Sequence, residues 1–115
     1  MMADLFVKGI NGQVWVNRER VLISKKGVLA TLIFGRSKER IIEVRHIQSI
    51  NFQEAGWSCN GYLQFQSNDN EEKVTDILNA RKNENTIIFN GDNNSEAVKV
   101  LEFIEKVINN RKNVE

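Results

Sequence analysis

The first two-thirds of the chain alternates apolar and polar residues with a period of two, which is typical of half-buried β-strands. In the first such run, Val14 and Val16 share one face while Trp15 takes the other. Glycine or polar turns separate most neighbouring runs, which favours antiparallel pairing. The pattern predicts seven strands, at residues 13–17, 20–24, 28–34, 40–44, 50–53, 61–66 and 86–90.

One amphipathic helix is predicted after the last strand, over residues 94–110. Either Asn93 with Glu96 three residues later, or Ser95 itself, is expected to cap its first turn. The apolar residues recur at helical spacing and are flanked by further apolar positions, so the stripe is wide enough to cover a sheet. This stripe consists of Ala97, Leu101, Ile104 and Ile108.

Residues 67–85 interrupt the alternation with a polar stretch rich in Asn, Asp, Glu and Lys. Residues 74–80 could form one or two helical turns, because they hold the few apolar side chains of the stretch. The rest is expected to be a mobile loop, since it offers little apolar surface to bury.

Seven short antiparallel strands followed by one helix is an α+β order. A strongly bent sheet has an open end, which an amphipathic helix can cover. The length of 115 residues is that of one domain. The sequence therefore predicts a single domain spanning residues 1–115, in which a barrel of seven short strands is capped by the C-terminal helix.

Several turn and strand segments resemble those of a known family. They are GINGQ at 9–13, ISKKG at 23–27, IIEV at 41–44, IQSI at 47–50, AGW at 55–57 and NGYLQF at 60–65. With these segments the chain resembles, over nearly its whole length, a bacterial family of pleckstrin-homology-like (PH-like) domains of unassigned function. The resemblance implies a PH-like barrel, but it selects no ligand because that fold hosts lipid, peptide and protein binders.

Sixteen Lys and Arg residues balance fifteen Asp and Glu residues, which gives a net charge of +1. So small a charge provides no overall attraction to nucleic acid, so we expect no nucleic-acid partner. Cys59 is the only cysteine, which excludes an intrachain disulfide. The sequence has neither a basic leader before an apolar run nor an apolar run of about 18 residues, so we expect a cytoplasmic protein.

Candidate catalytic and metal-binding chemistry is sparse. His46 and Cys59 are the only residues of their types, whereas a nucleophile, its base and an orienting group must converge. A dyad of the two is conceivable, but an exposed turn histidine and a small packed cysteine are the favoured interpretations. There is no Cys-x-x-Cys, no His pair and no calcium-loop spacing. We expect no enzyme activity, no metal and no cofactor.

Basic residues form the first candidate binding site. In a PH-like barrel the loops after the first, third and sixth strands gather at one end, and Arg81 and Lys82 could approach from the last of these. With Ser37, such residues could hold an anionic lipid head group or another phosphorylated ligand. A solvated rim is favoured, because Glu19 and Glu39 supply opposite charge. The candidate ligand-binding residues are Arg18, Arg20, Arg36, Lys38 and Arg40.

Large apolar residues form the second candidate site. Trp15 points away from its valine neighbours and could anchor a protein partner, although core or rim packing is the favoured interpretation. Phe103 and Val107 flank the helical stripe and could bury a second surface in an oligomer, but a wide core-facing stripe explains them more simply. Trp57 is expected to pack beside Tyr62. The sequence thus predicts a non-catalytic binding module for a protein partner or for self-assembly. The alternative is a module that binds an anionic membrane or a phosphate ligand through the basic residues.

Overall fold

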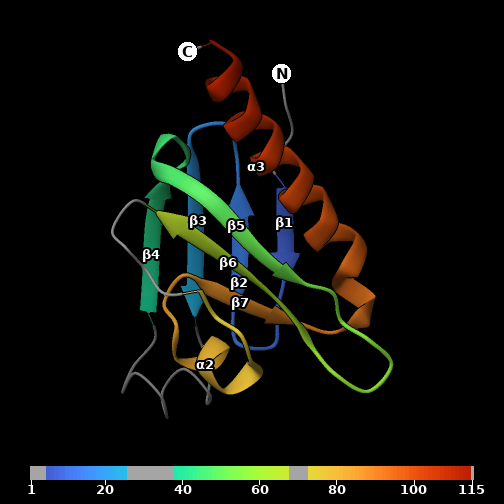
Figure 1. Cartoon of the computed structure of the whole chain (residues 1–115). Helices are drawn as coiled ribbons and strands as arrows, with labels where there is room; N and C mark the ends of the chain where they lie inside the picture. The colour runs from blue at the N-terminus through green and yellow to red at the C-terminus, as the bar shows by residue number, and fades with distance from the viewer. Residues whose placement is uncertain (1–4, 26–37, 68–72, 115) are drawn as a thin grey trace.

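The computed structural model describes residues 5–25, 38–67 and 73–114, without the side chains of Lys38 and of residues 112–114. Within these residues the chain has an α+β fold of seven strands in two antiparallel sheets, followed by a long helix (Figure 1). The predicted class and final helix are confirmed, and the described residues contain seven strands, six of which are among those predicted. The predicted strand at 28–34 and the candidate ligand residue Arg36 lie outside the described residues.

The four-stranded sheet holds β1 (Leu5–Lys8), β2 (Gln13–Val16), β3 (Arg20–Lys25) and β4 (Lys38–Glu43), in that order and antiparallel throughout. β1 is not among the predicted strands, because residues 5–7 are consecutively apolar and show no alternation. It forms by pairing with the edge of β2, with Leu5 opposite Val16 and Lys8 opposite Gln13.

The three-stranded sheet holds β5 (Ile47–Gln53), β6 (Gly61–Ser67) and β7 (Thr86–Phe89), again antiparallel and in chain order. The short 3-10 helix η1 (Val44–His46) joins it to β4. The predicted start of the fifth strand, residue 50, is too late, since Ile47 already pairs with Ser67. An irregularity in the register between Ile47 and Ser49 interrupts the alternation there.

The two sheets lie face to face, and the strands of the three-stranded sheet run across those of the other (Figure 1). The inward residues of both sheets form the core, as Val14 and Ile23 do on one side and Leu63 and Phe65 on the other. Within the described residues no ladder joins the sheets, so hydrogen bonds do not close the predicted barrel.

The helix α3 (Asn94–Val114) follows the 3-10 turn η2 (Gly91–Asn93) and lies against both β1 and β5. It therefore covers one side of the core where the two sheets meet (Figure 1). Near its C-terminus, Arg111 donates hydrogen bonds to the carbonyl oxygens of Arg45 and Ile47, which ties the helix to η1 and β5. Its buried residues are Ala97, Val100, Ile104 and Ile108, with Leu101 half-buried at the border.

The turn between β1 and β2 connects the two sheets. The amide of Ile10 donates to the carbonyl oxygen of Ile88 in β7 (2.8 Å), and the amide of Ile88 donates to Asn11 Oδ1 (2.9 Å). The turn is closed by the amide of Gly9, which donates to the carbonyl oxygen of Gly12 (2.8 Å). Gly12 has a φ of +152°, and a Cβ there would lie 2.2 Å from a carbonyl oxygen of β3, so this position requires glycine.

Asn11→Ala is expected to destabilise the fold by about 1–3 kcal/mol, because it leaves the buried amide of Ile88 without an acceptor. Urea denaturation followed by circular dichroism measures the loss. Asn109→Ala, at an exposed position of α3, is the matched control and should change stability by less than about 0.5 kcal/mol. Equal midpoints for the two variants would contradict the role assigned to Asn11.

Candidate functional site

Part of the outer face of the three-stranded sheet, over β6 and β7, is covered by the chain itself. Residues 73–85, including α2 (Ile77–Lys82), lie across this face, and α2 contacts both β6 and β7 (Figure 1). A short helix forms in this stretch, at residues 77–82 and not at the predicted 74–80, and Asp76 caps it by accepting from the amide of Asn79 (2.8 Å). Beneath the helix lies a small apolar cluster of Tyr62, Val74, Ala80 and Ile88, with Ile77 half-buried against it.

Hydrogen bonds fix this covering segment to the sheet. Gln64 Oε1 accepts from the amide of Val74 (2.8 Å) and from Asn51 Nδ2 (3.1 Å). Asn51 Nδ2 also donates to the carbonyl oxygen of Val74 (2.7 Å), and the Tyr62 hydroxyl donates to the same oxygen (3.3 Å). All four residues are buried, so these bonds tie the start of the segment, at Val74, to the three-stranded sheet.

The outer face of the four-stranded sheet differs, because its outward apolar residues remain in contact with solvent. The strand register places Phe6 opposite Trp15, Trp15 opposite Leu22, and Leu22 opposite Ile41. Phe6 is 41% exposed and Ile41 64% exposed, while the two central residues are half-buried. The rings of Phe6 and Trp15 are in contact, with centroids 5.3 Å apart. One residue from each strand thus forms a continuous apolar row across the sheet.

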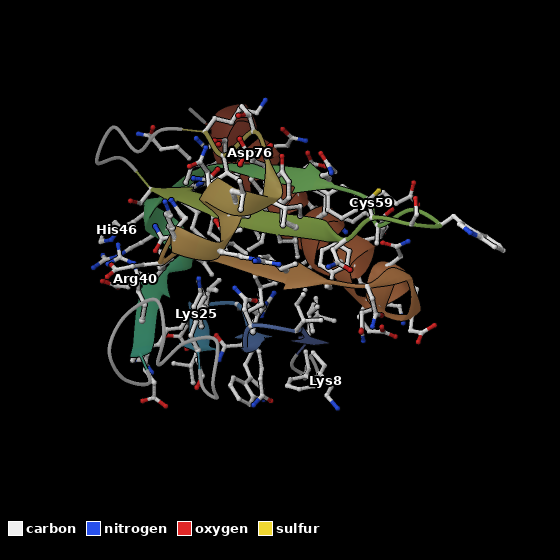
Figure 2. All side chains as sticks on the ribbon, turned by 90° about the horizontal axis from the view of Figure 1, so that it is seen from below. Lys8, Lys25, Arg40, His46, Cys59 and Asp76 are labelled. Carbon is white, nitrogen blue, oxygen red and sulfur yellow. The ribbon has the colours of Figure 1, made fainter. Side chains whose placement is uncertain are left out.

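Polar residues border this apolar row on both sides. On one side of the apolar row, the neighbouring row of residues runs from the exposed Lys8 on β1 to the exposed Glu39 on β4. On the other side of the apolar row, Arg20 on β3 lies opposite Glu43 on β4 in the strand register. Figure 2 shows Lys8 on the side of the sheet that faces away from the three-stranded sheet. An apolar centre with a mixed-charge rim is the arrangement found in protein–protein interfaces. We take this face as the candidate functional site.

The basic residues singled out in the sequence do not gather at one end of the fold. Arg20 begins β3 opposite Glu43, whereas Lys38 begins β4 opposite Lys25 at the other end of both strands. Arg18 lies in the turn before β3 and is exposed. Arg40 pairs with the buried Ile23, so its side chain belongs to the inner face of the sheet. The register therefore separates Arg18 and Arg20 from Lys38 and Arg40.

A cavity of about 180 Å³ opens where β3 ends and β4 begins. Lys25 is nearly fully buried there and donates from its ammonium group to the carbonyl oxygen of Asn83. Arg40 Nε and Arg81 Nε are buried and, within the described residues, lack a hydrogen-bond partner. The lining consists of Ile23, Lys25, Glu39, Arg40 and Glu84. Glu39 and Arg40 are neighbours on β4, so their side chains belong to opposite faces of the sheet.

Phe103 and Val107 are half-buried, and both pack against the core from α3. The structure therefore accounts for them by packing within the molecule, and Trp15 remains the interface candidate. The prediction that Trp57 packs beside Tyr62 is wrong, because Trp57 is fully exposed. It occupies the second position of a turn in which the amide of Gly56 donates to the carbonyl oxygen of Cys59 (2.9 Å), beyond the ends of β5 and β6.

His46 and Cys59 lie at opposite ends of the β5–β6 hairpin, as Figure 2 shows, so they cannot form a dyad. His46 is exposed with Nδ1 3.9 Å from Glu43 Oε2, and Cys59 is exposed. Across residues 5–25, 38–67 and 73–114, no three His, Cys, Asp or Glu side chains come together in a way that could hold a metal ion.

No helix in the described part of the chain combines the length and apolar character needed to cross a membrane. Comparison of the sequence and structure with models of protein families, with curated proteins and with solved structures finds no match. The candidate site therefore rests on the geometry of this chain alone.

The covering segment gives a pH-dependent prediction. Burial, reinforced by the nearby Asp76 carboxylate, raises the pKa of Tyr62 above its usual value. Below about pH 10 the hydroxyl is protonated in both folded and unfolded chains, so its contribution to stability is complete. Above that pH the unfolded chain loses the proton more readily, so the free energy of unfolding should fall as the pH rises.

Tyr62 is the only tyrosine, so tyrosinate absorbance follows it alone. The apparent pKa should be higher in buffer than in concentrated urea. Tyr62→Phe should lower the free energy of unfolding by about 1 kcal/mol at neutral pH. As the pH rises above about 10, its stability should fall less steeply than that of the unaltered protein. Identical titration curves in buffer and urea would show that the hydroxyl is not buried.

Proposed function

We propose that the protein is a non-catalytic binding module that binds protein through the outer face of its four-stranded sheet. The observation that carries the proposal is the apolar row, which aligns an exposed Phe6 and Ile41 with the half-buried Trp15 and Leu22 between them. Burying one such side chain fully contributes about 1.5–3 kcal/mol. Aromatic residues at the centre of an interface commonly supply much of the binding energy.

The fold proposed for this module is PH-like. Support comes from the sequence segments that resemble the PH-like family, from the division into sheets of four and three strands, and from the helix packed on both sheets. The fold does not select the ligand, so the proposal for protein binding depends on the apolar row and not on the family.

The second candidate function is binding of a phosphorylated or other anionic ligand in the cavity beside Lys25 and Arg40. Arg40 Nε favours it, because it is buried, has no hydrogen-bond partner among the described residues, and belongs to a guanidinium group, which binds phosphate well. Glu84 in the lining opposes it, and Arg18 and Arg20 lie too far along the sheet to contribute. Protein binding is therefore the better-supported function.

A photoreactive amino acid tests the protein-binding face. Benzoylphenylalanine in place of Ile41, in the full chain expressed in its native cells, should form protein adducts on illumination. The same residue in place of Leu78 is the matched control, because Leu78 is equally exposed (69%) but lies on α2, away from the row. Adding Phe6→Lys at the other end of the row should reduce adducts at position 41 at least about threefold. Equal adduct yields at positions 41 and 78 would contradict the proposal.

Nuclear magnetic resonance titration with inorganic phosphate and with inositol hexakisphosphate tests the second candidate. The protein-binding proposal predicts no saturable shifts in the amides of Lys25, Arg40 and Glu84 at low ionic strength, where charge interactions are strongest. Saturable shifts that Arg40→Gln abolishes and the exposed control Arg18→Gln leaves intact would establish the anion site instead.

A further inference from the structure

We infer that the partner that binds the apolar row is a second copy of this chain, packed face to face about a two-fold axis that runs parallel to the strands. The inference rests on the proposed function, and it assigns the partner of that same face. It is carried by the order of residue types across the four strands, which is complementary to itself.

The row changes character from one side of the sheet to the other. Phe6 and Trp15, on β1 and β2, are aromatic, whereas Leu22 and Ile41, on β3 and β4, are aliphatic. A two-fold axis parallel to the strands, passing between β2 and β3, places β1 over β4 of the second copy and β2 over its β3. Each aromatic side chain then meets an aliphatic one, with Phe6 over Ile41 and Trp15 over Leu22.

The charged residues beside the row obey the same symmetry. Lys8 on β1 and Glu39 on β4 belong to one neighbouring row, and both are exposed. Within the described residues neither forms an ion pair in its own chain. The proposed axis brings Lys8 of each copy to Glu39 of the other, which makes two equivalent opposite-charge contacts.

The other face-to-face arrangement, with the two-fold axis along the row, is less favourable. It would place Trp15 on its own copy and Glu39 on Glu43 of the second chain, so like charges would meet twice. In the proposed arrangement Glu43 keeps its own partner, the Arg45 guanidinium, with Nε 3.1 Å from its Oε1. Among the described residues, the distribution of charge therefore favours the axis parallel to the strands.

The size of the face sets the strength of the association. Strands about 4.8 Å apart make the row only about 14 Å long. Because the row is so short, we expect a reversible dimer, with a dissociation constant of about 10–500 µM. The mixed charge of the rim argues against an anionic membrane as the partner, since Glu39 and Glu43 share the face.

Sedimentation equilibrium from about 10 µM to about 1 mM tests the inference in low-salt buffer. The unaltered protein should follow a monomer–dimer equilibrium. Ile41→Lys should remove the dimer, and the matched control Leu78→Lys should leave it unchanged, since both residues are exposed but only Ile41 belongs to the row. Thermal unfolding checks that each variant folds.

Charge reversal then tests the axis. Lys8→Glu and Glu39→Lys should each weaken the dimer at least about threefold, because each places like charges together. The double variant carries both reversals and should restore the original affinity, which only contact between these two positions of two copies explains. Failure of the double variant to recover would overturn the two-fold arrangement.

The outcomes separate this inference from the proposed function. A chain that stays monomeric throughout the concentration range overturns self-association. In that case adducts with other proteins at position 41 would still support a protein-binding face, whereas equal adducts at positions 41 and 78 would overturn both. A dimer that Ile41→Lys leaves intact would show that the copies associate through another surface.

Discussion

Burial of the apolar space between two short sheets holds this structure together, and α3 seals the side that they leave open. The helix can do so because its buried residues, Ala97, Val100 and Ile104, face β1 and β5 at once. Asn11 and Arg111 add directed hydrogen bonds at two further junctions, one to β7 and one to η1. The inner faces of both sheets are buried in the core, and α3 covers one side of it, so each sheet has one further face, which points outward.

Each of the two outer faces departs from the usual burial of apolar side chains and exposure of polar ones. On the three-stranded sheet the amides of Asn51 and Gln64 are buried and satisfied beneath residues 73–85. On the four-stranded sheet Phe6 and Ile41 face solvent. Buried polar groups and exposed apolar rows are the informative departures from the general pattern of burial. The described residues thus show buried polar groups on one outer face and an exposed apolar row on the other.

The periodicity of apolar residues predicted the helix and strands whose own sequence carries a repeat. It missed β1, which forms by pairing with a neighbouring strand. The final helix and most strands have a repeat that can be read from the sequence, but β1 lacks alternation and forms on the edge of β2. The cover over the three-stranded sheet depends on amide hydrogen bonds that leave no apolar signal. Trp15 could be singled out from the sequence, yet its row exists only through the register with Leu22 and Ile41, which no single strand specifies.

The turn that carries Trp57 has a spectroscopic consequence. The amide and carbonyl of the preceding Ala55 are clasped by the Asn94 side chain (3.0 and 2.9 Å), so the indole extends into water from a fixed base. Trp15, by contrast, is half-buried against Phe6. The two indoles should therefore emit at different wavelengths. The fluorescence of Trp57, which is surrounded by water, should stay constant, whereas that of Trp15 should change when the outer face of the four-stranded sheet is covered.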